Sequence, residues 1–208
     1  MKLDVLKNMS YGMYIIGARD EKMVGCVANT VVQITNDPIT FIVSLNKNNV
    51  TTKTILKTKK FSVSILDEET NPEVIGTFGY HTSREVDKYE KVHYQEVDGL
   101  PVLEDSCGYI TCEVINILET TTHLVILGKV LTMDGYKDIK PMTYRFYHEQ
   151  LKGKSPKTAP TYIPETNTKK TVWKCKVCGY EVEMDKLPED YRCPICGQPM
   201  TAFERIEK

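Results

Sequence analysis

The sequence predicts a mainly β protein in two parts, an antiparallel β-barrel with short helices and a small cysteine-rich unit at the C-terminal end. Most of residues 1–150 fall into segments rich in Val, Ile, Thr and aromatic side chains, which favour strands. These segments differ in length and are joined by long connections, which is typical of a closed or partly closed barrel. Four of the seven cysteines lie between residues 175 and 196.

The expected elements follow from local patterns along the chain. The two longest strand segments are joined by a short Thr-rich turn and predict an antiparallel hairpin. Two short helices are expected over 51–59, with Asn48 or Asn49 as a cap, and over 71–79, where Pro72 suits the first helical position. The strands are expected at 13–18, 23–35, 40–45, 61–66, 107–119 and 122–135.

Composition excludes several classes of protein. The chain has 208 residues, of which 41% are hydrophobic and 26% charged, so it can bury a core and is not disordered. Lys plus Arg number 27 and Asp plus Glu 28, a net charge of −1 that gives no reason to expect nucleic acid or an anionic membrane as partner. Apolar runs are too short to span a bilayer, and the N-terminal segment lacks the pattern of a secretory signal. A cytoplasmic location is therefore expected.

The cysteine spacing predicts a metal site. An odd number of cysteines does not suit a disulfide framework. Two C-x-x-C pairs separated by fourteen residues can instead close four thiolates around one tetrahedral metal. The expected ligands are Cys175, Cys178, Cys193 and Cys196. The remaining cysteines, Cys26, Cys107 and Cys112, are expected to be small buried side chains.

Three segments divide the chain. Residues 1–163 form the expected large domain, and the proline-containing stretch 164–171 is the expected linker. Residues 172–208 form a unit too short to be stable on an apolar core, so the metal must stabilise it.

The C-terminal unit resembles a short-loop rubredoxin. The resemblance rests on C-x-x-C-G-Y at 175–180, L-P-E-D-Y at 187–191, C-P-x-C-G at 193–197 and a late Phe203-Glu204. It implies one mononuclear iron on the four thiolates, which stabilise iron in either charge state. A zinc ribbon uses the same knuckles and remains the alternative, although the balanced charge of the unit gives no basic face for nucleic acid.

Aromatic side chains are unusually frequent in so small a unit. We expect them to pack over the metal as its core and to keep water off one side. They are Trp173, Tyr180, Tyr191 and Phe203. Gly179 and Gly197 each follow the second cysteine of a pair, where the turn can require a positive φ.

The large domain lacks the glycine motifs of dinucleotide-binding and P-loop folds. Its segments G-C-V-A-N-T-V-V-Q-I-T at 25–35 and P-I-T-F-I-V-S-L-N-K-N-N-V-T at 38–51 resemble the flavin reductase-like family. Residues 78–89 and 152–162 fit the same resemblance, which covers about 5–163. It implies an FMN-binding split β-barrel, a homodimer with the flavin at its interface, and residues 152–162 folded across the flavin site.

Candidate flavin-binding residues follow from this resemblance together with side-chain chemistry. It places Asn29 and Thr30 at the flavin ring and the phosphate near residues 46–51, where amides, hydroxyls, an ammonium group and a helix start can bind an anion. The full set is Ala28, Asn29, Thr30, Gln33, Ser44, Asn46, Lys47, Asn49, Thr51, His81 and Arg84. The plain alternatives are solvent-facing strand residues, a polar turn with a helix cap, and a solvated loop around His81 and Arg84.

The combination of domains resembles the high-molecular-weight rubredoxins of anaerobic bacteria. That resemblance implies an NAD(P)H-dependent flavin/rubredoxin oxidoreductase, which passes electrons through FMN and the iron to a partner redox protein such as a flavodiiron oxygen or nitric oxide reductase. Hydride transfer needs no protein acid or base, so no catalytic residue is expected. His93, His123 and His148 have no partner pattern and are expected to do no chemistry. Two alternatives remain open: an electron carrier without its own NAD(P)H oxidation, and a flavin-binding protein with a structural zinc ribbon.

Overall fold

The computed structural model describes residues 3–136, 139–163, 171–184 and 186–207. The chain divides into two compact units, residues 1–163 and 164–208. The linker expected over 164–171 lies outside the described residues, except for its last residue, which begins a strand.

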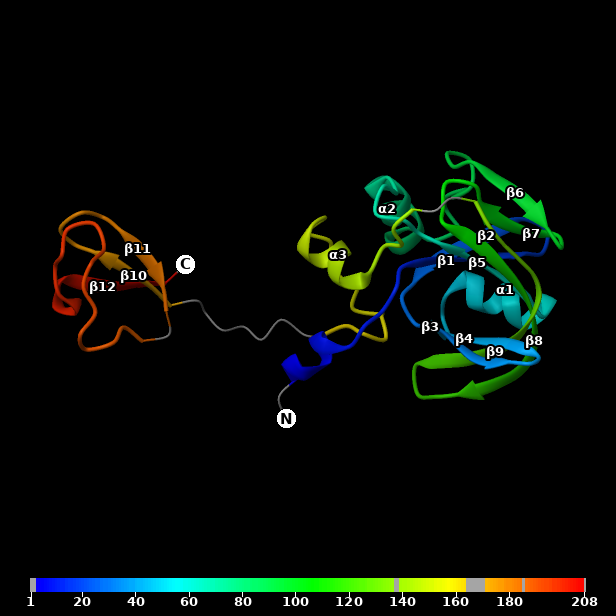
Figure 1. The fold of residues 1–208 in the computed structure, drawn as a ribbon, viewed down its shortest axis with the longest axis horizontal. Coiled ribbons are helices and arrows are strands. Elements are labelled where there is room, and N and C mark those ends of the chain that lie inside the picture. The colour runs from blue at the N-terminus through cyan, green and yellow to red at the C-terminus, as the bar shows by residue number, and fades with distance from the viewer. Residues whose placement is uncertain (1–2, 137–138, 164–170, 185, 208) are drawn as a thin grey trace. The chain divides into compact units, whose positions relative to one another are not determined.

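A curled antiparallel sheet forms the larger unit (Figure 1). Its seven strands lie in the order β2-β1-β5-β8-β9-β4-β3. They are β1 (Tyr14–Arg19), β2 (Met23–Ala28), β3 (Val31–Asn36), β4 (Ile39–Asn46), β5 (Lys60–Ile65), β8 (Gly108–Glu119) and β9 (His123–Gly135). The expected mainly β fold and the long hairpin, now β8–β9, are confirmed.

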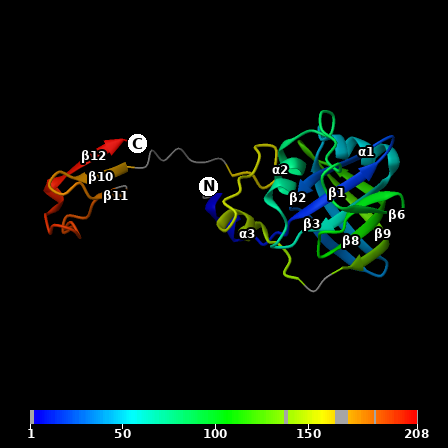
Figure 2. The ribbon, with the colours of Figure 1, turned by 90° about the horizontal axis from the view of Figure 1, so that it is seen from above.

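The two edges of this sheet, β2 and β3, are consecutive in the chain and joined only by Asn29 and Thr30. So short a connection brings the two edges together, and the N–H of Ser44 on β4 bonds the Thr30 carbonyl at 3.1 Å. Figure 2 shows the strands wrapping around in this way. The sheet is therefore a barrel with a seam between β2 and β3.

The seam corrects one expectation. The sequence predicts a single strand over 23–35, but the structure has two, which end and begin around Asn29 and Thr30. The physical reason is pairing, because β2 pairs with β1 and β3 pairs with β4 at the opposite edge. Residues that favour strands continue without a break through Asn29 and Thr30, where the chain stops pairing with β1 and starts pairing with β4.

Helices cover the barrel near the seam. Helix α1 (Val50–Thr58) is capped by Asn49, whose side chain accepts the N–H of Thr51, and Ile55 of α1 is fully buried in the barrel core. Helix α2 (Pro72–Tyr80) is capped by Asn71. Figure 1 shows α1 between strands of the curled sheet. Both helices lie within one residue of the bounds that the sequence predicts.

Several elements of this unit are absent from the strands and helices that the sequence predicts, although Asp98-Gly99, a turn signal in the sequence, does form a hairpin turn. They are a 3₁₀ turn at Leu3–Asn8, the hairpin β6 (Tyr94–Val97) and β7 (Leu100–Leu103), and helix α3 (Tyr144–Glu149). Each is short, and β6 alternates between exposed and half-buried side chains. Strand β7 is buried against β1 and β5 of the barrel.

Two apolar clusters hold the barrel. One fills its interior and includes Phe61, Ile126 and Val43, none of which is measurably exposed. The other lies between β1, α2 and α3, and includes Phe78 and Met142. The second cluster fixes α2 and α3 beside the seam.

The C-terminal unit is a three-stranded sheet in the order β11-β10-β12. Its elements are β10 (Thr171–Cys175), β11 (Glu181–Glu183), a 3₁₀ turn at Met200–Ala202, and β12 (Phe203–Glu207). Leu187 and Phe203 are buried with two cysteines, and the expected aromatics pack around them. None of the helices in the described ranges of the whole chain is long and apolar enough to cross a membrane.

Candidate functional site

The first site lies at two matching turns of the C-terminal unit. In each turn a glycine N–H bonds the carbonyl of the first cysteine at 2.8 Å, Gly179 to Cys175 and Gly197 to Cys193. The glycines have φ of 77° and 71°, a conformation that strains any residue with a Cβ. The expected role of both glycines is thus confirmed by their backbone geometry.

The four predicted ligands converge. The sulfur atoms of Cys175, Cys178, Cys193 and Cys196 all lie within 4.8 Å of one another. The Sγ atoms of Cys175 and Cys196 are 3.6 Å apart, and those of Cys178 and Cys193 are 3.5 Å apart. A tetrahedral metal with bonds of about 2.3 Å to sulfur needs sulfurs about 3.8 Å apart. The cage therefore fits one metal ion.

Backbone N–H groups favour the thiolate forms. The N–H of Cys178 holds the pKa of Cys175 below its ordinary value. Burial opposes ionisation of Cys193, but the N–H of Cys196 and its neighbour outweigh it and lower its pKa to about 7. The pKa of Cys196 is raised to about 12 despite an N–H bond from Gln198, because burial and then the other three sulfurs oppose its ionisation. Four adjacent thiolates need a cation, which is the role of the metal.

Burial of the cage is one-sided. Cys175 and Cys193 are buried, whereas Cys178 is exposed and Cys196 half-buried. Tyr191 packs edge-on to the ring of Phe203 with centroids 5.5 Å apart on the covered side. An electron has a short path to the surface on the side of Cys178.

The second site is a cavity of about 740 Å³ beside the seam of the barrel, part of it open to solvent. Its walls come from the ends of β2 and β4, from α2 and α3, and from residues 154–160, a segment we call the strap. Its lining is mostly aromatic and aliphatic with a few polar side chains, which is the lining of a typical ligand pocket. Cys26 lies in the wall, where burial raises its pKa to about 11 and keeps it a neutral thiol.

Two buried polar atoms beside this cavity have no hydrogen-bond partner of acceptable geometry in the described part of the chain. They are Oγ1 of Thr51, on the first turn of α1, and Nε2 of His123, at the start of β9. Burial lowers the pKa of His123, and the backbone carbonyl of Thr158 in the strap partly opposes this. Buried polar groups are normally bonded, and His123 is the one of these two residues that lines the cavity and would face a polar ligand there.

The structure brings only part of the predicted set to the cavity. Residues of that set that line it are Ala28, Asn29, Ser44, Asn46 and Asn49. Thr30 and Thr51 lie next to them in the chain, and the Thr30 hydroxyl donates to Asn29 Oδ1 at 3.0 Å.

Besides Thr30 and Thr51, four predicted residues do not line the cavity. Gln33 is exposed and bonds the Thr35 carbonyl on β3. His81 and Arg84 follow α2 on the surface. The ammonium group of Lys47, which directly follows β4, pairs at 2.5 Å with the carboxylate of Glu119, the last residue of β8.

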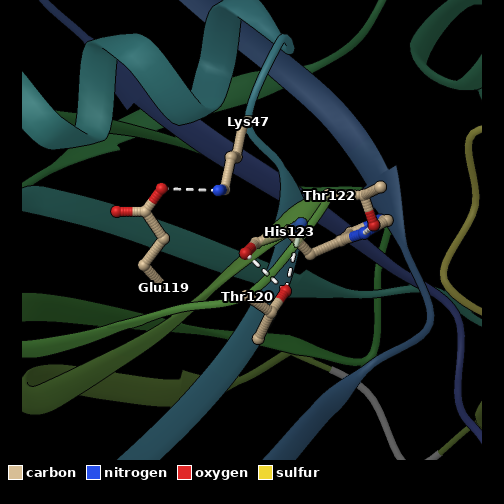
Figure 3. Close-up of polar contacts among 5 residues, drawn as sticks. All are labelled: Lys47, Glu119, Thr120, Thr122 and His123. Atoms are coloured by element: carbon tan, nitrogen blue, oxygen red, sulfur yellow. Dashed lines mark hydrogen bonds and ion pairs between the residues drawn. The ribbon is translucent and has the colours of Figure 1, made fainter.

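Figure 3 shows the turn that joins β8 to β9, with Lys47 beside it. The Thr120 hydroxyl bonds the His123 carbonyl at 2.7 Å and accepts its N–H at 3.2 Å, which fixes the start of β9. Nδ1 of His123 lies 2.8 Å from the Thr122 hydroxyl, and this contact orients the ring. His123 thus belongs to the cavity wall, although no sequence pattern indicates a role for it.

Sequence reasoning also missed three tyrosines in the wall, Tyr80, Tyr144 and Tyr147. They contact the strap, since the hydroxyls of Tyr80 and Tyr147 both bond the Lys154 carbonyl. His123 faces Asn46 through the pairing of β9 with β4. These contacts join segments that are far apart in the sequence, so no local motif could have indicated them.

Comparisons with known proteins agree with both sites. Residues 6–153 match the flavin reductase like domain, and residues 173–204 match the rubrerythrin, rubredoxin-like domain. A high molecular weight rubredoxin from Moorella thermoacetica is 36% identical and covers 99% of this chain and 100% of the relative. A ferric-chelate reductase (NAD(P)H) from Archaeoglobus fulgidus is 34% identical over 78% of this chain and 98% of that protein. The solved NADH:FAD oxidoreductase SgcE6 of Streptomyces globisporus has the same fold, with a TM-score of 0.63 at 18% identity over 67% of this chain and 83% of that one.

The barrel defines a flavin reductase-type oxidoreductase with a rubredoxin-like domain attached. The chain belongs to the flavin reductase-like family and, over its whole length, to the high molecular weight rubredoxins within it. Its cofactors are accordingly a flavin in the barrel and iron on the four cysteines, with NAD(P)H as electron donor.

Proposed function

We propose that this chain oxidises NAD(P)H at an FMN in the barrel cavity and passes the electrons one at a time through the iron on its four cysteines to a partner redox protein in the cytoplasm. The observation that carries the proposal is the presence, on one chain, of a cavity with unpartnered buried polar atoms and a one-sided cage of four sulfurs. FMN supplies the exchange between two-electron and one-electron chemistry. The chain supplies binding, orientation and exclusion of water.

The residues at the seam would hold the cofactor. Asn29 and Thr30 lie where β2 passes into β3, hydrogen-bonded to each other, and would offer amide and hydroxyl groups to the ring. Asn49 and Thr51 lie at the start of α1, with the Thr51 hydroxyl unpartnered, and suit the phosphate. His123 Nε2 is a further donor or acceptor there. Lys47 would contribute only if Glu119 released it.

A homodimer is part of the proposal. Exposed apolar side chains lie on β3, β8 and β9, which with β4 form one continuous part of the sheet. They are Val32, Ile34, Ile115, Leu118, Leu131 and Met133. Such side chains on neighbouring strands support an interface with a second copy. Light scattering on the purified chain tests this, with Leu118→Glu expected to shift it toward a monomer.

The central experiment follows electrons through the full-length protein under anaerobic conditions. NADH or NADPH is added to the purified holoprotein while the visible bands of flavin and iron are recorded, and the flavin released on denaturation is identified by mass. We expect the flavin band to bleach first and the iron band to follow. Cys193→Ser removes a sulfur ligand and should keep flavin bleaching while the iron band is lost.

The outcomes separate the proposal from its alternatives. If neither nicotinamide bleaches the flavin, the protein is an electron carrier reduced by another enzyme. If the C-terminal unit is colourless and contains zinc, the unit is a structural ribbon. Either result would overturn the proposal.

The proposal also names the electron acceptor. A flavodiiron protein that reduces oxygen or nitric oxide would take electrons at the exposed Cys178 side. The ferric-chelate reductase relative favours a second candidate, a small ferric chelate. Stopped-flow mixing of the reduced holoprotein with each acceptor would rank them by the rate at which the iron band returns.

A further inference from the structure

The proposed reaction, on which this inference rests, leaves a proton to be removed. Its balance is NAD(P)H + 2 Fe³⁺ → NAD(P)⁺ + 2 Fe²⁺ + H⁺. The C–H bond of the dihydronicotinamide breaks, its two electrons reach the iron one after the other, and the hydrogen remains as a proton. Part of the cavity is open to solvent, so the proton can leave either through that opening or through proton-bearing side chains in the wall.

One part of the wall carries a row of proton-bearing side chains. The hydroxyls of Tyr144 on α3 and Ser155 in the strap both belong to residues that line the cavity, and they are hydrogen-bonded to each other. Behind them, Ser155 Oγ lies 3.4 Å from Nε2 of His148. His148 does not line the cavity and its ring is half-buried. The row therefore leads from the cavity toward the surface.

The contacts of His148, at the outer end of the row, fix the direction in which the hydrogen bonds are donated. Nδ1 of His148 lies 2.7 Å from the carbonyl oxygen of Gly153, which can only accept a hydrogen bond. Nδ1 must therefore carry the hydrogen, and in the neutral ring Nε2 is left as an acceptor. The lone pair of Nε2 faces Ser155, so Ser155 donates to it.

The near end agrees with that direction. The amide Nδ2 of Asn29 can only donate, and it bonds Thr161 Oγ1 at 2.7 Å. Thr161 in turn donates to the Tyr144 hydroxyl at 3.1 Å. The Tyr144 proton is then left for Ser155. Every donor points the same way, from Asn29 at the seam to His148.

We propose that Tyr144, Ser155 and His148 form a proton relay that carries the proton of NAD(P)H oxidation out of the cavity. As a proton arrives on the Tyr144 oxygen, Tyr144 gives its own to Ser155, and Ser155 gives its own to Nε2 of His148. One O–H bond breaks and one forms at each hydroxyl, and an N–H bond forms at Nε2 of His148. The cationic ring then releases its Nδ1 proton to water, and exchange with water restores the Nδ1–H form. Asn29 and Thr161 are positioning residues that set the direction.

Packing holds the relay in line. The ring of His148 meets that of Tyr144 edge-on with centroids 4.3 Å apart, and that of Tyr147 with centroids 5.2 Å apart. Gly153 cannot be larger, because an added Cβ would lie about 2.1 Å from the Tyr147 ring. The same contacts could serve only to clamp the strap to α3, so the test must separate proton transfer from clamping.

Kinetics of the holoprotein provide that separation. His148→Gln should lower kcat for anaerobic NAD(P)H oxidation about tenfold, leave KM and flavin affinity unchanged, and alter the solvent deuterium isotope effect on kcat. Added imidazole should restore the rate of His148→Ala, because a free base can replace a relay but not a clamp. His93→Gln is the matched control, since His93 also makes one polar contact, to Asp105, but on the exposed surface. It should change nothing.

A second measurement needs no bound flavin. In the chain with ¹⁵N-labelled histidine, NMR should report His148 as the Nδ1–H tautomer at neutral pH. Ser155→Ala should shift its Nε2 resonance and slow turnover, while Ser155→Thr keeps both close to the wild-type values.

The outcomes are distinct. A wild-type protein that fails to oxidise NAD(P)H would defeat the proposed function itself. Turnover in the wild type with no change in His148→Gln would defeat only the relay. Equal losses of flavin affinity and rate in His148→Ala, without rescue by imidazole, would assign these residues to clamping and also overturn the relay.

Discussion

The two units of this chain keep their structures in different ways. The barrel encloses apolar clusters with fully buried side chains such as Phe61 and Ile126, and its cavity lies beside them. In the C-terminal unit, half of the buried core cluster consists of Cys175 and Cys193, with Leu187 and Phe203 as the other half. The difference teaches that the metal ligands are part of the core of the small unit, whereas the barrel has an apolar core that is separate from the proposed flavin ligands.

The largest effect that tests this contrast is removal of the metal. Chelation, or Cys193→Ser, should unfold residues 171–207 and leave the barrel folded, because structural metals contribute about 10–16 kcal/mol in comparable small units. Amide hydrogen exchange in β10 and β12 measures it. Cys107→Ser, in the barrel, is the control and should leave the metal content unchanged. Protected amides in the metal-free unit would contradict the contrast.

The barrel should respond to loss of apolar packing instead. Phe61 is fully buried, so Phe61→Ala should lower the free energy of unfolding of the barrel by about 3–5 kcal/mol, through lost burial and a cavity. Urea unfolding followed by circular dichroism checks this, with the iron spectrum unchanged at concentrations below the barrel transition. Val86→Ala, at an exposed site outside the proposed dimer face, should cost at most about 0.5 kcal/mol.

Backbone conformation gives a smaller effect of opposite sign in the two units. An added Cβ would meet nothing at Gly179 or at Gly76, but Gly179 has a positive φ and Gly76 lies inside α2. Gly179→Ala should destabilise the metal turn by roughly 1–2 kcal/mol, seen as faster metal release. Gly76→Ala should stabilise the barrel by about 0.5–1 kcal/mol. A change in stability of the same sign at both positions would show that the backbone angle φ does not determine the effect of the substitution.

Helix caps give a change of similar size and locate the cofactor within the barrel. Asn49 and Asn71 each accept a backbone N–H at 2.9 Å, so each change to Ala should cost about 1 kcal/mol of stability. Only Asn49 lines the cavity. Flavin fluorescence titration should therefore detect weaker binding in Asn49→Ala and no change in Asn71→Ala, and equal affinities would exclude Asn49 from the site.

The same contrast explains what could be read from the sequence. The metal site was fully predictable, because Cys175 and Cys178, like Cys193 and Cys196, lie within single turns whose spacing defines the geometry. The β-rich character, both capped helices and the long hairpin also follow from local patterns. For the cavity, local polar residues such as Asn46 and Asn49 were found, but Gln33 and Arg84 lie outside it.

The missing parts depend on contacts between distant segments. His123 reaches the cavity only because β9 pairs with β4, and His148 meets Ser155 only because the strap folds back on α3. The break at Asn29 and Thr30 could not be recognised either, because the residues on both sides favour strands. Strand pairing decided it, and pairing is a property of the whole sheet.

The seam between β2 and β3 has a consequence for the holoprotein. Unpaired backbone groups at a sheet margin are ordinarily the weakest place in a barrel, the first to exchange hydrogens and the first to open. Here the two edge strands border the cavity, so a bound flavin would hold them together. Saturating the protein with its cofactor should slow amide exchange most in these two strands, and the yellow form should resist proteases better than the colourless one.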